Sequence, residues 1–320
     1  MNSTANARDG SPSDASTIVI GVDGSPGSRA ALRWGLREAE RRRVPVLIAH
    51  TFGPSLRDLK LGQGHDGPAD LRRFHEGAER ARTLLARTGQ QARASYPLLD
   101  VETVAINERP SRGLVEVARS ADLLVVGTHG AGSFAAVLVG STVMSVASRA
   151  RCTVVAVPAP TSDEHPRHGV VVGVDLRAGS DVVLARAFAE AHRHHEPLTA
   201  LHAWSEPTLA TAGSPVPSRL DVADHLEVGK AALASILAPW LERYPDVVVR
   251  RHVVASHPPR ALAAAAHDAR LLVVGCRTTG RGRTRPLGTV SHAVLHLAGC
   301  PVAVVHPSID LSQVERAVGV

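Results

Sequence analysis

Short apolar runs alternate along this chain with longer segments in which apolar residues recur every three or four positions. The runs have the length and β-branched content of buried strands, and the longer segments have the period of helices that bury one side. In the first half, strands are expected in a run that ends at Asp23 and at 46–52, 101–106, 123–127 and 153–157. Helices are expected after Asp23 and near 70–95, 110–120 and 140–150. This alternation predicts an α/β fold.

The first helix shows one apolar face, and the same face recurs in the second half of the chain. Its members in the first half are Ala31, Leu32, Gly35, Leu36 and Ala39, and their counterparts are Val183, Leu184, Ala187, Phe188 and Ala191. A helical period that survives a change of residues indicates a helix at both places.

The chain contains two copies of one unit. Gly21-Val22-Asp23 recurs 152 positions later as Gly173-Val174-Asp175, and the apolar run 123–127 recurs as 271–275. A fixed offset of this kind is the signature of a repeat. We expect a tail at 1–16, a first domain at 17–159, a linker at 160–167, a second domain at 168–307 and a tail at 308–320.

Each copy is expected to be a doubly wound domain with a five-stranded parallel sheet in the order 3-2-1-4-5 and helices on both faces. The last strand of each copy, at 154–157 and 302–305, then lies at a sheet edge with unpaired backbone groups. Pairing these two edges with each other predicts a pseudo-two-fold dimer of domains within the chain. Whether two chains also form a homodimer is left open.

Composition places the chain among ordinary globular proteins. It has 320 residues, 44% of them apolar and 21% charged, which excludes a wholly disordered or coiled-coil chain. Three cysteines favour a reducing compartment, so we expect a cytoplasmic protein. The first sixteen residues lack the apolar core of a secretory signal, and the uncharged stretch 130–148 is too rich in serine and glycine for a membrane span.

The formal net charge of +6 comes almost wholly from arginine. The runs 41–43 and 72–73 are interpreted as solvated helix faces, and only the group at 281, 283 and 285 resembles a basic patch. This distribution does not favour nucleic acid as a partner.

Glycines after the fourth strand predict a phosphate site. Gly127, Gly130, Gly140 and Ser141 form the pattern G-x2-G-x9-G-S, in which Gly140 and Ser141 open a helix. Backbone N–H groups and the positive end of the helix dipole favour an anion there, and glycine lets a ligand approach the backbone closely. The candidate site at this turn also includes Thr128 and Thr142. A flexible loop before a Gly-Ser helix start is the alternative interpretation.

Two further strand ends point to the same edge of the sheet, where ligands of doubly wound folds bind. Gly21, Val22 and Asp23 end the first strand, and the carboxylate of Asp23 suits ribose hydroxyls or a metal ion. The alternative is a turn, since Asp-Gly-Ser-Pro is also good turn chemistry. Ala49 and His50 end the second strand, where the backbone is placed to meet the edge of a base.

The glycine spacing, the early aspartate and the strand order together resemble the universal stress protein family, and the duplication resembles its tandem members. The resemblance covers both repeats. It implies an ATP-binding fold in which the glycines and Ser141 hold the phosphates, Asp23 the ribose and the end of the second strand the adenine. The expected cofactor is ATP, with Mg²⁺ as an optional companion. It also implies a regulatory role in stress or dormancy rather than catalysis.

The second repeat departs from this pattern. Its candidate site consists of Asp175, Gly275, Gly280, Gly288 and Thr289, but Thr278 stands where Gly130 stands in the first repeat. A Cβ there would crowd the phosphates, while arginines at 277, 281 and 283 would offset part of the loss by charge. We expect a weaker or absent second site.

Two alternatives remain open at this stage. The first is a slow Mg²⁺-dependent ATPase, although no G-x4-G-K-[ST] motif is present, and the second is a nucleotide-free scaffold that acts through its domain edges. His192, His194 and His195 cluster at a helix end, where cations are favoured, and we expect no metal site there. Cys152 and Cys300 are interpreted as core residues, whereas Cys276 lies in the second candidate loop.

Overall fold

The first repeat forms the predicted alternation of strands and helices. The computed structural model describes residues 16–53, 68–128, 139–159, 167–176, 180–205, 219–276, 287–307 and 309. The strands are β1 (Ile18–Gly21), β2 (Val46–Thr51), β3 (Val101–Ile106), β4 (Leu123–Gly127) and β5 (Thr153–Val157). The helices are α1 (Pro26–Arg42), α3 (Pro68–Ser95), α4 (Pro110–Val117) and α5 (Ser141–Arg149).

The second repeat has the same succession. Its strands are β6 (Val170–Gly173), β7 (Leu198–Trp204), β8 (Val249–Ala255), β9 (Leu271–Gly275) and β10 (Val302–Val305). Its helices are α6 (Asp181–His194), α7 (Arg219–Arg243), α8 (Pro258–Ala265) and α9 (Thr289–Leu297).

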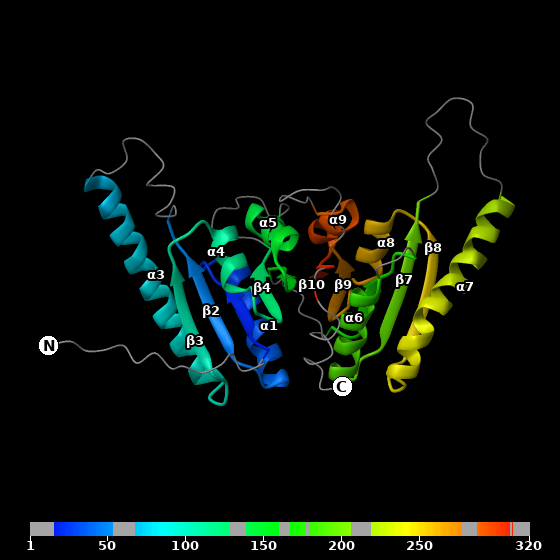
Figure 1. The fold of residues 1–320 in the computed structure, drawn as a ribbon, viewed down its shortest axis with the longest axis horizontal. Coiled ribbons are helices and arrows are strands. Elements are labelled where there is room, and N and C mark those ends of the chain that lie inside the picture. The colour runs from blue at the N-terminus through cyan, green and yellow to red at the C-terminus, as the bar shows by residue number, and fades with distance from the viewer. Residues whose placement is uncertain are drawn as a thin grey trace, which may run out of the picture.

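All ten strands form one sheet in the order β3-β2-β1-β4-β5-β10-β9-β6-β7-β8 (Figure 1). Within each half the neighbouring strands are parallel and the order is 3-2-1-4-5, which confirms the predicted fold class. β5 and β10 meet in antiparallel register, with Val155 opposite Ala303. The pairing of the two last strands is therefore confirmed, and it joins the repeats into an intrachain pseudo-dimer.

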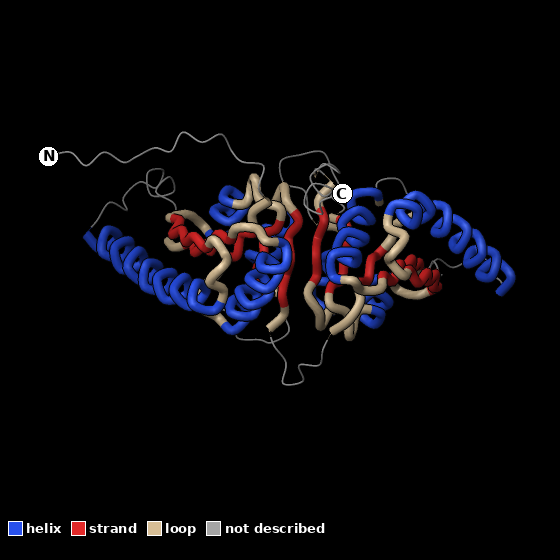
Figure 2. The backbone as a smooth tube through the Cα atoms, turned by 90° about the horizontal axis from the view of Figure 1, so that it is seen from below, coloured by secondary structure: helices blue, strands red, loops and turns tan. Residues whose placement is uncertain are grey.

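Helices cover both faces of the sheet (Figure 2). The side chains of β1 show why, because Ile18 and Ile20 belong to one buried cluster and Val19 to another. The first cluster includes residues of α1 and α3, and the second includes residues of α4 and α5. Strands that are buried on both faces explain the continuous apolar runs of the sequence.

Local signals fix the position of α1 above the sheet. Ser25 caps the helix by accepting a hydrogen bond from the Ser28 N–H at 3.1 Å, and Pro26 begins it. Gly35 lets the helix approach the sheet, because a Cβ there would lie 2.6 Å from Cδ1 of Ile20. The helix thus begins three residues after Asp23, at the carboxyl end of β1.

The structure corrects one interpretation of the arginine runs. Arg41 and Arg43 are exposed, but the side chain of Arg42 is only 2% exposed and is held by three carboxylates. The run 41–43 is therefore not a uniformly solvated face. Among the described residues, no helix has the length and apolar character needed to cross a membrane.

Candidate functional site

The end of β1 forms a tight, hydrogen-bonded turn. Val22 N–H donates to the Ala49 carbonyl at 2.9 Å, which extends the pairing with β2 beyond the strand. Asp23 is exposed, and its Oδ1 accepts a hydrogen bond from the Ser25 N–H at 2.9 Å. Gly24 follows with a φ of 81°, which favours glycine. The predicted turn chemistry and a carboxylate at the strand end are therefore both present.

His50 links β2 to this turn through its ring, which the sequence did not indicate. Its Nδ1 lies 2.6 Å from the Val22 carbonyl oxygen. A carbonyl can only accept, so Nδ1 carries the proton, and in the neutral ring Nε2 is the acceptor. In the second repeat His202 makes the same contact with the Val174 carbonyl at 2.9 Å.

The end of β4 brings the start of α5 into place. Thr128 N–H donates to the Val157 carbonyl at 2.9 Å, and the Thr128 carbonyl accepts from the Gly140 N–H at 2.8 Å. Gly140 is the N-cap of α5, without a side-chain capping bond, and the first turn has no acidic residue. Ser141 is exposed and Thr142 half-buried. This helix N-terminus therefore has the electrostatic character that favours an anion.

Gly127 and Gly140, the two glycines of the pattern that the structure describes, differ in the space available for a side chain. A Cβ on Gly127 would lie 2.4 Å from the backbone carbon of Gly27 and 2.7 Å from the Ser28 nitrogen, so packing of α1 against β4 requires this glycine. A Cβ on Gly140 would lie 3.7 Å from the Thr128 oxygen, an ordinary contact. Gly130 lies outside the described residues.

The second repeat preserves part of this arrangement. Val174 N–H donates to the Leu201 carbonyl at 2.9 Å, and the carbonyl of Asp175 accepts from the Ser180 hydroxyl at 2.5 Å. Gly288 caps α9, which begins at Thr289, with a backbone conformation close to that of Gly140. Gly275 differs from Gly127, because its Cβ would meet the Val183 side chain at 3.1 Å rather than backbone. Gly280, Thr278 and the arginines at 277, 281, 283 and 285 lie outside the described residues.

A comparison with known protein families fits this geometry. The model of the universal stress protein family matches residues 15–158 and 167–306. The chain belongs to the universal stress protein family.

Curated universal stress proteins resemble the chain along nearly their whole length. Universal stress protein Rv2623 of Mycobacterium tuberculosis is 33% identical over 303 residues, an alignment that covers 91% of this chain and 97% of that protein. A universal stress protein of Mycolicibacterium smegmatis is 34% identical over 291 residues with the same coverage. The crystal structure of a universal stress protein from Archaeoglobus fulgidus shares the fold, with a TM-score of 0.65 and 18% identity over 91% of this chain and 98% of that chain.

The two universal stress domains touch beside their candidate sites. Val139, which precedes Gly140, donates its N–H to Nδ1 of His296 on α9 at 3.3 Å. The His296 and His292 rings lie 5.1 Å apart. In Figure 1, α5 and α9 lie next to each other near the middle of the molecule. The residue just before the N-cap of α5 is thus hydrogen-bonded to the second domain.

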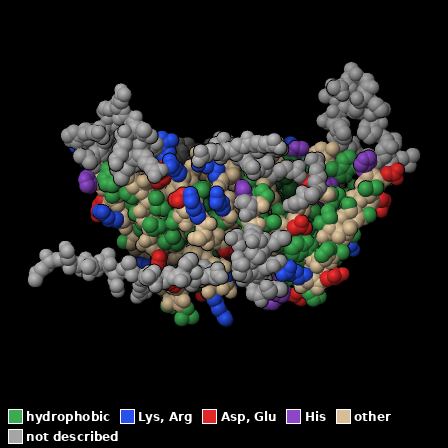
Figure 3. All heavy atoms as spheres, viewed as in Figure 1, with side chains coloured by type: hydrophobic (Ala, Val, Ile, Leu, Met, Phe, Trp, Pro, Cys, Tyr) green, Lys and Arg blue, Asp and Glu red, His purple; other side chains and the backbone are tan. Residues whose placement is uncertain are grey.

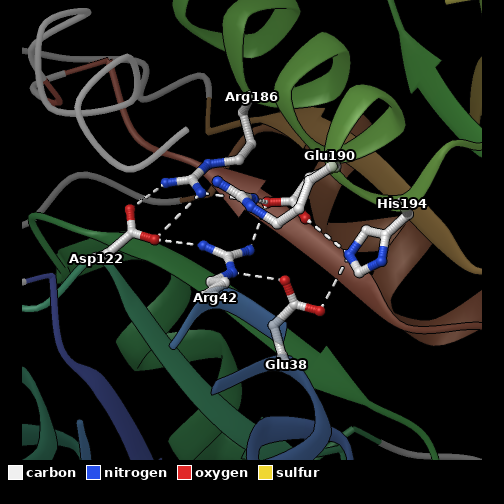
Figure 4. A network of polar contacts seen from close by, with 7 residues as sticks. Glu38, Arg42, Asp122, Arg186, Glu190 and His194 are labelled. Atoms are coloured by element: carbon white, nitrogen blue, oxygen red, sulfur yellow. Dashed lines mark hydrogen bonds and ion pairs between the residues drawn. The ribbon is translucent and has the colours of Figure 1, made fainter. Parts of the chain in front are cut away.

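A buried ionic network joins the domains through α1 and α6 (Figure 4). Arg42 contacts Glu38 at 2.5 Å, Asp122 at 2.5 Å and Glu190 at 2.6 Å. Arg186 contacts Asp122 at 2.5 Å and Glu190 at 3.2 Å. These side chains are at most 8% exposed, so each charge is balanced by its neighbours rather than by water.

His194 completes the network, and its ring nitrogen Nε2 lies 3.1 Å from Glu38 and 3.6 Å from Glu190. Burial alone lowers the pKa of His194, but its hydrogen bonds and charge attraction with the two carboxylates raise the pKa to about 9. Burial raises the pKa of Glu38 and Glu190, yet the arginine and histidine charges outweigh it and lower both.

Glu38, Glu190 and His194 each offer one metal-ligand atom, and these atoms lie within 4.8 Å of one another. Arg42 is hydrogen-bonded to both carboxylates and would repel a further cation. The cluster therefore acts as an ion-pair network. The neighbouring His192 turns away to Asp246 at 2.7 Å, and His195 ends the helix with a φ of 51°.

All three cysteines are buried. Burial raises the pKa of the Cys152 thiol to about 12 and that of Cys276 and Cys300 to about 11. Cys276, which follows β9, is only 2% exposed. Its thiol is therefore neither accessible nor readily ionised.

Proposed function

We propose that this chain binds ATP, accompanied by Mg²⁺, at the carboxyl ends of β1, β2 and β4 in the first domain, and that it acts as a regulatory stress protein rather than an enzyme. Its membership of the universal stress protein family and its relatives support the role in stress. We infer the identity of the nucleotide from the family resemblance, and we infer the residues that bind it from the geometry of the strand ends.

The observation that carries this proposal is the presence of a glycine, Gly140, where the described structure does not require one. Its φ of −61° suits any residue, and a Cβ would make only an ordinary contact with Thr128. Neither backbone strain nor packing against the described residues therefore requires a glycine. A phosphate that approaches the N-terminus of α5 closely does require one.

The remaining contacts follow from the three strand ends. The N–H groups of the first turn of α5 and the hydroxyl of Ser141 would hold phosphate oxygens. The carboxylate of Asp23, fixed by its bond from Ser25, would accept hydrogen bonds from the ribose. The backbone around Ala49, which His50 ties to Val22, would border the adenine.

Binding without fast turnover is the expected behaviour. The sequence has no P-loop lysine, which in NTPases grips the β- and γ-phosphates. We therefore expect phosphate release close to that of buffer. Release well above buffer that is abolished by Asp23→Asn, with ATP still bound, would favour the slow ATPase instead.

The test is Gly140→Ser, with Gly288→Ser in the second domain as its matched control. Serine is at least as good an N-cap as glycine, so α5 keeps its stability, but its side chain occupies the phosphate position and its hydroxyl takes an N–H. We expect ATP affinity of the first site to fall at least about tenfold in Gly140→Ser at an unchanged melting temperature. Gly288→Ser should leave that site intact. Unchanged affinity in Gly140→Ser would overturn the proposal.

A further inference from the structure

The helices on equivalent faces of the two domains differ in charge. α1 and α3 together carry eleven arginines against five carboxylates, whereas α6 and α7 carry four arginines and one lysine against six carboxylates. The excess of six positive charges on α1 and α3 equals the formal net charge of the whole chain. In Figure 3, acidic side chains line the outer edge of the second domain. The basic character therefore belongs to one helical layer of the first domain.

Four of these arginines form a stripe along α1. They are exposed, and they stand four residues apart, about one helical turn each. The members of the stripe are Arg29, Arg33, Arg37 and Arg41. In α6 the positions of Arg33 and Arg37 are taken by the buried Ala185 and Ala189. The stripe is thus a feature of the first domain and not of the repeat.

A groove of about 780 Å³ lies between α1 and α3, and the stripe begins in it. Arg29 lines the groove from α1, and Arg80 and Arg87 line it from α3. Hydroxyl and amide groups of Thr83, Thr88 and Gln91 stand beside them. Guanidinium groups with neighbouring neutral donors suit phosphate, which accepts hydrogen bonds but donates none when fully ionised.

The groove is elongated in the direction of α3. Its lining runs from Glu76 to Gln91, about 22 Å along the helix, or about the rise of six stacked nucleotides. Glu76 and Glu79 occupy one end, where Glu79 is offset by Arg82 at 3.1 Å. The charged side chains of the remainder are all arginines, and they stand among neutral polar and aliphatic residues such as Leu32 and Leu84. An elongated groove of about 780 Å³ that is walled by two helices has room for one extended chain.

The contiguous arginine runs of the sequence do not favour nucleic acid, but the stripe and the groove are formed by residues outside such runs or at their edge. We propose that the groove between α1 and α3, together with the arginine stripe, binds the phosphodiester backbone of single-stranded nucleic acid. None of the described residues that line the groove is aromatic, so binding is expected to depend on phosphates and to tolerate any base sequence. RNA and single-stranded DNA share this backbone, and both are expected to bind. The affinity falls steeply as salt concentration rises.

An anionic membrane is the competing partner for such a surface, and the described side chains argue against it. Membrane-surface helices expose large apolar residues next to their basic ones. The exposed large apolar residues of the described chain are Leu98, Val228, Val248 and Leu297, and none of them lies on α1 or α3. The apolar faces of both helices pack on the sheet instead.

Fluorescence anisotropy of the full-length protein with a labelled oligonucleotide tests the proposal. The probes are a mixed-sequence single-stranded RNA and its DNA equivalent, each about twelve nucleotides long, and the competitors are duplex DNA and phosphatidylserine vesicles. Arg80→Ala/Arg87→Ala removes two charges from the groove, and Arg250→Ala/Arg251→Ala removes two exposed charges from β8 of the second domain as the control. All four arginines are exposed, so both variants are expected to fold.

We expect micromolar affinity at low salt, a loss of about fivefold or more in the groove variant and less than about twofold in the control. The salt slope should fall by about two in the groove variant only. Equal losses in both variants, no binding of either single strand, or preferred binding of duplex or vesicles would each overturn the proposal. Gly140→Ser should bind the oligonucleotide like the unmodified protein, which separates this test from that of ATP binding.

Discussion

Glu38 and Glu190 occupy equivalent positions in the two repeats, and both contact Arg42 and His194, so each glutamate has one partner in its own helix and one across the domain interface. The cations are themselves equivalent, since each follows its glutamate by four residues. The pseudo-two-fold relationship thus holds for the backbone, while the side chains differ. Arginine in one repeat is matched by histidine in the other, and the pKa of this histidine is raised to about 9, so the network contains one cation that loses its charge in the alkaline range.

Loss of either partner of the Asp122–Arg186 pair should destabilise the fold. Removal of one member leaves the other charge buried, at a cost of about 3 kcal/mol or more. We expect Asp122→Asn and Arg186→Met each to lower the urea midpoint clearly, and the double variant to lose less than the sum of the two.

The exposed pair Glu79 and Arg82 supplies the control for this prediction, because its side chains are 70% and 72% exposed. Alanine at both positions should change the free energy of unfolding by less than about 1 kcal/mol. Comparable losses for the buried and the exposed pair would contradict the structural role of the network.

Thermal stability should depend on pH through His194. Its pKa is about 9 in the folded chain and about 6.5 when unfolded, so its charge stabilises the fold fully below about pH 6.5 and progressively less as pH rises through 9. His194→Gln should therefore melt well below the unmodified protein at pH 6, with the difference shrinking towards pH 10. His192→Gln, at the half-exposed contact with Asp246, is the control. A difference that stays constant with pH would contradict the pKa.

Glycines at equivalent positions should respond differently to alanine. In Gly127→Ala the new Cβ meets the α1 backbone, which must move, whereas in Gly275→Ala it meets only the Val183 side chain. We expect Gly127→Ala to destabilise the chain by several kcal/mol and Gly275→Ala by about 1–2 kcal/mol. Chemical unfolding measures both, and equal effects would show that Gly127 is not needed for packing.

The three cysteine thiols should not react with thiol reagents in the native protein. Burial both shields Cys152, Cys276 and Cys300 and raises their pKa values to about 12, 11 and 11, so thiolate is scarce at pH 8. A chromogenic disulfide reagent should detect none of them within minutes and all three after denaturation. If one thiol reacts rapidly in the native protein and this reaction is lost in Cys276→Ser, Cys276 is accessible to the reagent, which would contradict this prediction.

The sequence predicted the architecture because its signals are local or repeated. Apolar runs, helical periods and the two Gly-Val-Asp strand ends gave the order of elements, and the bare last strands gave their antiparallel pairing. The burial of Arg42 has no such signal, since two of its partners lie 80 and 148 positions away. The stripe on α1 forms no contiguous charge run, since its arginines are four residues apart, and it becomes a patch only when the helix brings them to one side.

The sequence predicted which strand ends form the candidate site, but it did not predict the packing and hydrogen bonds that hold them in place. Asp23 and Gly140 stand where the fold positions a ligand, and whether they bind one stays a prediction. Gly127 turned out to have a packing role that only the approach of α1 to β4 reveals. The ring contact of His50 with Val22 likewise depends on two strands that are far apart in sequence.

Titration calorimetry of Mg-ATP into the nucleotide-stripped, full-length protein tests the central claim most directly. The account predicts at least one ATP bound per chain, with the site in the first domain lost in Gly140→Ser and kept in Gly288→Ser. A second equivalent would show that the second domain binds as well, despite Thr278. If no binding heat is detected even at high concentrations of Mg-ATP, the account is contradicted and a nucleotide-free scaffold is favoured.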